Sequence, residues 1–241
     1  MWFMLLLQAL GLMATVSGHG RLLVPAARGS AAVSGPDAPD YNTNGLNCGG
    51  FAHQYSVNGG RCGICGDPWD MKTPRNHELG GKYGRGIISK RYQSGETITV
   101  LVEISAHHKG YWQLRLCPDA TRNDQKCFDE NLLELKDGGT EYYPGSTGSK
   151  FQVIYKLPAG ITCDHCVMQW RYTAGNNWGK CKNGTQGLGC GDQEQFYSCA
   201  DISIGSTGES TENEPHEISN TTKICTQYMK GSLHNDTGKD I

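Results

Sequence analysis

Ten of the eleven cysteines in this chain fall between Cys48 and Cys199, and their number and clustering constrain the fold more than any other feature. In an oxidising compartment, clustered cysteines of this kind form a disulfide framework. We therefore expect five bridges within one domain, with Cys225 left over. The spacing leaves the connectivity open, although Cys117 and Cys127 are close enough in the sequence to be partners.

The N-terminal segment indicates that the compartment is oxidising. Residues 2–14 are almost wholly apolar, too few to span a bilayer comfortably, and small residues ending at Gly18 follow them. This layout predicts a secretory signal peptide at 1–18, and a secreted, extracellular mature chain that begins at His19. No later segment of the sequence is long and apolar enough to cross a membrane.

Composition divides the rest of the chain near residue 205. Glycine and turn dipeptides punctuate the sequence up to that point, whereas Ser, Thr, Glu and Asn dominate after it. We predict one domain at 19–205 and a flexible tail at 206–241. The net charge of −2 gives no electrostatic reason to expect a nucleic-acid partner. Three sequons fit a secreted glycoprotein and begin at Asn183, Asn220 and Asn235.

Segments with period-two hydrophobicity predict β-strands. In the clearest one, residues 97–105, four side chains fall on one face: Ile98, Val100, Val102 and Ile104. Four further segments fit strands: 111–116, 151–157, 166–173 and 196–204. Because glycine-rich turns separate them, we predict an all-β fold, an immunoglobulin- or fibronectin-like antiparallel β-sandwich with long disulfide-pinned loops. Residues 131–136 fit a helical turn and a strand equally well.

A histidine at the start of a mature chain can chelate a metal ion. Its α-amine and its own ring Nδ1 can bind the same ion, and an amine with a pKa of about 8 loses its proton readily. A second imidazole would complete three nitrogens in a roughly planar T, an arrangement that suits Cu(II). Candidates for that imidazole are His107 and His108, which follow directly after the clearest strand.

Several motifs occur together in a recognisable order. They are His19-Gly-Arg-Leu-Leu-Val-Pro, Gly60-Arg-Cys-Gly-Ile-Cys-Gly-Asp, His108-Lys-Gly-Tyr, Gln169-Trp-Arg before Tyr172, and the segment from Cys190 to Ile202. This set resembles the lytic polysaccharide mono-oxygenases, and most of all their auxiliary-activity family fifteen. The resemblance covers residues 19–205. Two departures are Ser30-Ala-Ala-Val in place of Ser-Met-Trp-Arg, and His107 where an Asn commonly stands.

The resemblance implies one copper ion per chain. Its ligands would be His19 and the histidine of an Ala-x-His step, which is His108 after Ala106 in this sequence. Ala106 would crowd one axial side of the metal. Since neighbouring strand residues face opposite sides, His107 would point elsewhere.

An aromatic ring would cover the other axial side of the copper. Phe196 in the last strand matches that position, and Tyr197 is the alternative. Gln193 and Glu194 would lie behind the ligands as supporting groups.

The implied activity is oxidative cleavage of a crystalline polysaccharide at C1 or C4, with O2 or H2O2 and an external electron donor. We expect chitin as the substrate, with cellulose as the second choice, and a monomer without nucleic-acid or membrane partners. Two alternatives use the same fold without this chemistry. One is a non-catalytic chitin-binding protein, and the other is a copper-binding protein that attacks no sugar.

Other metal-type and sugar-binding patterns have simpler interpretations. The Cys62-x-x-Cys65 and Cys163-x-x-Cys166 pairs could hold zinc, but a secreted chain favours disulfides. Nothing in the sequence brings together carboxylates for a hydrolase. Five histidines are interpreted as surface or loop residues: His53, His77, His165, His216 and His234. Four aromatics could stack on sugars or pack in loops: Tyr41, Tyr55, Trp69 and Trp178.

Overall fold

The computed structural model describes residues 19–35 and 39–206. Several sequence predictions therefore concern residues outside the described part of the chain. These are the signal peptide, the tail, Cys225, His216 and His234, and the sequons at Asn220 and Asn235.

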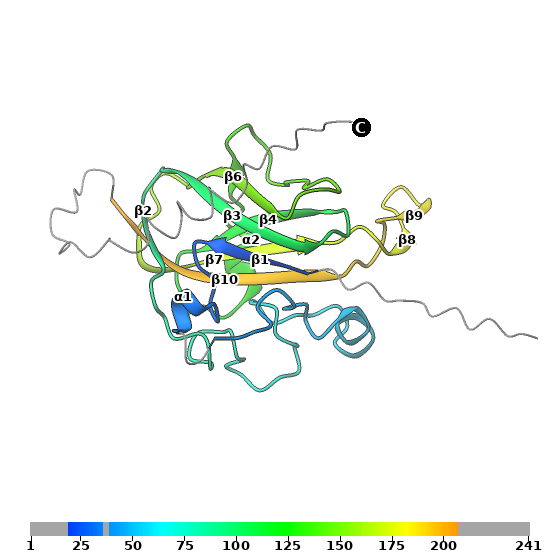
Figure 1. Cartoon of the computed structure of the whole chain (residues 1–241), viewed down its shortest axis with the longest axis horizontal. Coiled ribbons are helices and arrows are strands. Elements are labelled where there is room, and N and C mark those ends of the chain that lie inside the picture. The colour runs from blue at the N-terminus through cyan, green and yellow to red at the C-terminus, as the bar shows by residue number, and fades with distance from the viewer. Residues whose placement is uncertain (1–18, 36–38, 207–241) are drawn as a thin grey trace, which may run out of the picture. The chain divides into compact units, whose positions relative to one another are not determined.

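Two four-stranded sheets form the body of the described domain (Figure 1). The first sheet has the order β1 (His19–Val24), β3 (Thr97–Ala106), β6 (Lys150–Lys156) and β5 (Glu134–Leu135), with antiparallel pairing throughout. The second has the order β2 (Lys90–Gln93), β10 (Gln195–Gly205), β7 (Cys163–Thr173) and β4 (Tyr111–Cys117). Its only parallel pair is β2 with β10. A separate hairpin consists of β8 (Trp178–Lys180) and β9 (Gln186–Leu188).

Short helical turns occur in the loops. They are α1 (Ala31–Ser34), a π-helical turn at His53–Val57, and α2 (Gln125–Asp129). Asp124 caps α2, because its side chain accepts a hydrogen bond from the Cys127 N–H at 2.9 Å.

The main core lies between the two sheets. One face of each sheet contributes to it, so that Leu22, Val100 and Val102 from the first sheet are buried together with Trp112 and Trp170 from the second. A second, smaller core lies on the other face of β4, β7 and β10 and includes Phe128, Val167 and Cys199. The expected β-sandwich is therefore confirmed, and both faces of its second sheet are covered.

The five predicted strands are confirmed, with bounds that differ by up to a few residues. The undecided segment 131–136 is strand-like: it contains β5, and Leu132 bridges to Arg115. Five disulfides join the ten expected cysteines, in the pairs Cys48–Cys62, Cys65–Cys199, Cys117–Cys127, Cys163–Cys166 and Cys181–Cys190. The zinc interpretation is thereby excluded for both Cys-x-x-Cys segments.

A buried ion pair fastens the chain after β1 to the last strand. Arg28 donates two hydrogen bonds to the Asp201 carboxylate, at 2.7 and 2.5 Å, and both side chains are buried. His165 Nε2 lies 2.7 Å from the same carboxylate. The Cys65–Cys199 disulfide adds a covalent link between this strand and the long loop before β2.

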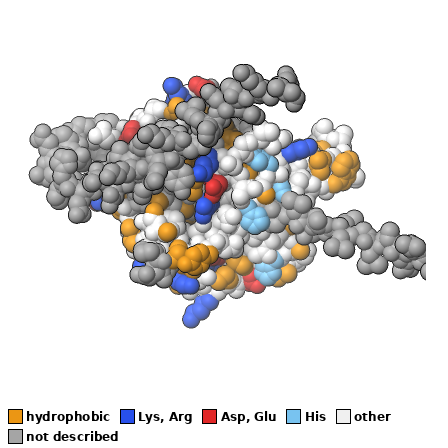
Figure 2. All heavy atoms as spheres, viewed as in Figure 1, with side chains coloured by type: hydrophobic (Ala, Val, Ile, Leu, Met, Phe, Trp, Pro, Cys, Tyr) orange, Lys and Arg blue, Asp and Glu red, His pale blue; other side chains and the backbone are white. Residues whose placement is uncertain are grey.

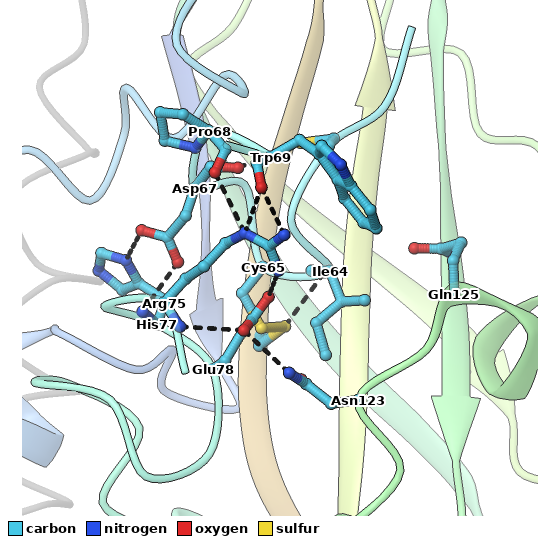
Figure 3. Close-up of polar contacts among 12 residues, drawn as sticks. Ile64, Cys65, Asp67, Pro68, Trp69, Arg75, His77, Glu78, Asn123 and Gln125 are labelled. Atoms are coloured by element: carbon cyan, nitrogen blue, oxygen red, sulfur yellow. Dashed lines mark hydrogen bonds and ion pairs between the residues drawn. A yellow bond between two sulfur atoms is a disulfide. The ribbon is translucent and has the colours of Figure 1, made fainter. Parts of the chain in front are cut away.

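The long loop also contains its own buried polar network (Figure 3). Arg75 pairs with Glu78 at 2.5 Å, and Asn123 donates to the same carboxylate at 2.8 Å. His77 lies 3.0 Å from Asp67 through Nδ1. It is a loop residue, as expected, but it is buried rather than on the surface. Buried polar contacts therefore hold residues 67–78 of this loop, which lie outside the helices and strands.

Candidate metal centre

His19 is the first residue of β1 and lies at the edge of the first sheet. In the β1–β3 ladder it is opposite Ala106, the last residue of β3. Its ring centroid is 6.3 Å from that of Phe196 on β10, with the two planes tilted by 40°. One end of the first sheet thus brings His19 against the second sheet.

Gly20 allows β1 to approach the core this closely. A Cβ atom at this position would lie 2.7 Å from Ile104 Cδ1 and 2.8 Å from Trp170 Cη2, well inside van der Waals contact. The Gly20 N–H donates to the Asn44 carbonyl at 3.0 Å. The residue after His19 is therefore packed on one side and hydrogen-bonded on the other, which fixes where His19 emerges.

His108 follows β3 in a tight turn and is buried. The Tyr172 hydroxyl accepts a hydrogen bond from the His108 N–H at 3.2 Å and donates to the Lys109 carbonyl at 2.5 Å. The Gly175 N–H donates to the His108 carbonyl at 2.7 Å. The backbone around His108 is thus held from β7 and from the loop that follows it.

Burial and nearby charge change the proton affinity of His108. Burial lowers the pKa of the His108 imidazole below its usual value, and electrostatic interaction with the nearby His19 lowers it further. The Glu194 carboxylate and a hydrogen bond with Asn176 act in the opposite direction. Because the lowering effects prevail, neutral imidazole, the form that binds a metal ion, is favoured.

Phe196 and Tyr197 lie on opposite faces of β10. Phe196 is fully buried and stacks on Tyr172, with ring centroids 6.0 Å apart. The Tyr197 hydroxyl instead donates to Gln195 Oε1 at 3.0 Å, and the Arg171 guanidinium lies 5.6 Å from the Tyr197 ring centroid. Of these two aromatic residues, Phe196 is the one whose ring lies against His19.

The other site residues expected from the sequence fall into two groups. Ala106 and Glu194 lie by the histidines: Ala106 is opposite His19, and the Glu194 charge acts on His108. Asn47 donates to the Glu194 carboxylate at 3.0 Å. Gln193 serves a different purpose, because its side chain hydrogen-bonds the backbone of Asn177 on the chain leading into β8.

His107 points away from this group. Its Nε2 contacts the Gly148 carbonyl, and its ring packs edge-on against Phe151 with centroids 5.6 Å apart. Both partners belong to the β6 side of the first sheet. The geometry therefore separates the two adjacent histidines as expected.

The sequence motifs do not predict two contacts to His108. Tyr172 stands in a motif that assigns it no role, and Asn176 stands outside the motifs. The Asn176 Nδ2 atom lies 2.7 Å from His108 Nδ1. No local sequence pattern predicts this contact, because the two residues are 68 positions apart in the chain.

Two of the four aromatics that could stack on sugars are well exposed. Tyr41 is 91% exposed, and Trp178 is 68% exposed. Trp178 pairs with the exposed Leu188 across the β8–β9 hairpin. Figure 2 shows hydrophobic side chains gathered at this hairpin, with histidine side chains on the same face of the molecule.

The other two aromatics take part in loop packing. The Tyr55 hydroxyl donates to the Gln193 carbonyl at 2.9 Å. Trp69 has the guanidinium groups of Arg61 and Arg75 over its ring, at 5.2 and 4.6 Å from the centroid. Tyr41 and Trp178 therefore remain the more accessible of the four.

Comparison with known proteins identifies the class. The family model described as "Lytic polysaccharide mono-oxygenase, cellulose-degrading" matches residues 19–202. The chain therefore belongs to the lytic polysaccharide mono-oxygenase family, and the enzyme class expected from the sequence is confirmed. No curated protein sequence shows significant similarity to the chain.

A solved structure places the chain more narrowly. It is similar to the AA15 lytic polysaccharide monooxygenase from Thermobia domestica in the Cu(I) state, with 46% identity and a TM-score of 0.74. The match covers 78% of this chain and 99% of that one. The expected membership of auxiliary-activity family fifteen is thereby confirmed.

Two more distant structures also match. One is a chitin binding domain from Burkholderia pseudomallei, with 12% identity, 78% and 100% coverage of the two chains, and a TM-score of 0.41. The other is an AA10 lytic polysaccharide monooxygenase from Streptomyces lividans, with 13% identity, 77% and 99% coverage, and a TM-score of 0.40. Similarity at this level says nothing about the activity of this chain. Within residues 19–35 and 39–206, no helix is long and apolar enough to span a bilayer.

Proposed function

We propose that this chain is a secreted, copper-dependent mono-oxygenase that cleaves glycosidic bonds of crystalline chitin at C1 or C4. In this proposal, one copper ion is bound by the α-amine and ring of His19 and by the ring of His108. One observation carries this proposal: His19 lies close to the buried His108 and to the Phe196 ring. His19 is also the first residue of β1 and of the family match.

The donor groups fit copper better than other common protein metals. The two imidazoles and the terminal amine would supply nitrogen only, and such sets suit Cu(II). Among the described residues, no three His, Cys, Asp or Glu side chains form a metal-binding group. A site that takes its third donor from the backbone does not require such a group.

The surrounding residues would orient the ligands and shape the site. Phe196, whose ring lies against His19, would close one side of the proposed copper site without supplying a ligand, and Ala106, opposite His19, would place only a methyl group on the other side. Glu194 places a carboxylate near the histidines, fixed in part by Asn47. The redox chemistry with O2 or H2O2 would come from the copper, and the electrons from an external donor.

The exposed aromatics offer a means of binding the polymer. Sugar rings present apolar C–H faces that stack on aromatic side chains, and Trp178 and Tyr41 are both accessible. The hairpin that carries Trp178 is held by the Cys181–Cys190 disulfide and by the Gln193 side chain. A hairpin restrained in this way loses less conformational entropy on substrate binding than a flexible one would.

The amine ligand depends on removal of residues 1–18. In support, the family match begins at residue 19. Intact-mass measurement and N-terminal sequencing of the secreted protein test this step directly. We expect a mature chain beginning at His19, and a chain beginning at any other residue would rule out the proposed ligand set.

Incubation of the copper-loaded mature protein with chitin and a reductant tests the activity. We expect soluble oligosaccharides whose masses show oxidation at C1 or C4, and we expect His108→Ala to release none. Parallel incubation with cellulose tests the second candidate substrate, which the description of the family model favours. Binding to chitin without oxidised products would indicate a non-catalytic chitin-binding protein. Copper binding without chitin binding and without oxidised products would indicate a copper-binding protein that attacks no sugar.

A further inference from the structure

We propose that Asn176 is a positioning residue that selects the tautomer of His108 suited to metal binding. In the metal-binding state, Asn176 Oδ1 accepts a hydrogen bond from the His108 Nδ1–H, which leaves the Nε2 lone pair for the metal ion. This inference rests on the proposed function, since it takes His108 as a ligand.

The contact between the two side chains is close and specific. The terminal amide nitrogen of Asn176 lies 2.7 Å from His108 Nδ1. His108 itself is only 5% exposed, so few alternative partners can reach its ring. Nδ1 is therefore the ring nitrogen occupied by the protein, and Nε2 is the nitrogen left to ligate.

The backbone on either side of Asn176 is fixed relative to His108. Gly175 donates its N–H to the His108 carbonyl at 2.7 Å, and Ala174 donates to the Glu194 carbonyl at 2.9 Å. On the other side, the Asn177 N–H donates to Gln193 Oε1 at 3.0 Å. Asn176 thus lies between two anchored neighbours, and its amide is kept beside the imidazole.

An asparagine amide can serve either tautomer of the imidazole. A half-turn about its last side-chain bond exchanges its NH2 donor for its oxygen acceptor. With NH2 toward Nδ1, the imidazole proton lies on Nε2, and that nitrogen cannot bind a metal. With oxygen toward Nδ1, the proton lies on Nδ1 and Nε2 is available. Metal binding therefore selects the second orientation, and the hydrogen bond then fixes the plane of the ring.

Substitution of Asn176 tests this role through copper affinity. Asn176→Leu keeps the size of the side chain but removes the acceptor, so we expect copper to bind about 10-fold more weakly in competition with a chelator. Asn176→Asp supplies an acceptor that cannot donate, and we expect it to bind at least as tightly as the original protein. Asn176→Leu should also change the Cu(II) electron paramagnetic resonance spectrum, whereas Asn176→Asp should restore it.

The neighbouring Asn177 provides matched controls, because its hydrogen bonds within the described residues use only backbone atoms. Asn177→Ala should leave copper affinity unchanged, and so should Asn177→Asp, which adds the same charge one residue away. Thermal denaturation shows whether each variant folds.

The possible results separate this inference from the proposed function. Unchanged copper affinity and spectrum in folded Asn176→Leu would overturn the role of Asn176. Failure of Asn176→Asp to restore affinity, or an equal gain in Asn177→Asp, would also overturn it. If His108→Ala binds copper as tightly as the original protein, the proposed ligand set itself is wrong. A loss in His108→Ala without a loss in Asn176→Leu would leave the proposed function intact.

Discussion

Individual glycines determine where the two histidines of the candidate metal centre lie. Gly20 lets β1 pack directly on Ile104 and Trp170, and so sets the position of His19. Gly110 does the same for the turn that carries His108, because it adopts φ of 73° and approaches the backbone of β7. Metal binding by His19 and His108 is therefore expected to depend on Gly20 and Gly110, which carry no side chain.

Gly110→Ala should therefore weaken copper binding although residue 110 carries no ligand. A Cβ atom there would lie 2.0 Å from the Thr173 carbonyl oxygen, and the positive φ is unfavourable for alanine. The turn must move, and we expect at least a 10-fold loss of copper affinity, measured by competition with a chelator.

Gly138→Ala is the matched control for this prediction. Gly138 also has a positive φ, of 97°, but a Cβ atom added there would meet no described atom within 4 Å. Normal copper affinity in Gly110→Ala, with a folded protein, would show that the turn does not position His108.

The last strand is the element that connects the site to the rest of the domain. One face of β10 places Phe196 in the core by His19, while the other face carries Cys199 and Asp201, which bind the long loop. Arg28 and Asp201 are both buried, so neither charge can be hydrated if its partner is removed.

Asp201→Asn should destabilise the fold by about 3–5 kcal/mol, because it leaves the Arg28 guanidinium buried without a counter-charge. Urea denaturation gives the free energy of unfolding. The comparison variant is Glu103→Gln, which breaks the partly exposed pair with Arg21 and should cost about 0–1 kcal/mol. Equal losses in the two variants would contradict the assignment of Arg28–Asp201 as a buried anchor.

At the level of elements, the sequence predicted what depends on local patterns. The strand at Thr97–Ala106 was found because its apolar side chains alternate, and five disulfides were expected because ten cysteines cluster. Only the Cys117–Cys127 pair was anticipated, since the other partners depend on how the loops fold over the second sheet.

The candidate site was predictable to a similar extent. His19, His108 and Phe196 stand in motifs, so they could be named from the sequence. The roles of Tyr172 and Asn176 could not, because each contacts His108 only after β4, β7 and β10 pair. The buried position of His77 was missed for the same reason: Asp40 and Asp67 reach it through the folding of a long loop.

At the scale of the whole domain, the proposed centre joins distant parts of the chain. His19 starts the first strand, His108 follows β3, and Phe196 lies in the opposite sheet. A ligand that binds only this folded arrangement stabilises it by mass action. Copper should therefore act as a cross-link as well as a cofactor.

Addition of copper to the metal-free mature protein should raise its melting temperature. At a free copper concentration of about 100 times Kd, the stabilisation should be about 2.7 kcal/mol. Differential scanning calorimetry measures the shift, and excess chelator should reverse it. His108→Ala should show a much smaller shift at the same copper concentration. An equal shift in that variant would place the stabilising copper elsewhere.

The central claim is that the terminal amine of His19 is a copper ligand together with the His19 and His108 rings. Calorimetric copper titration of two proteins tests this most directly: the mature chain beginning at His19, and the same chain acetylated at the His19 α-amine. We expect one tightly bound copper ion in the first protein and the loss of that tight binding in the second, because acetylation converts the amine into an amide and adds no new donor amine. Equally tight binding in both proteins would contradict the account.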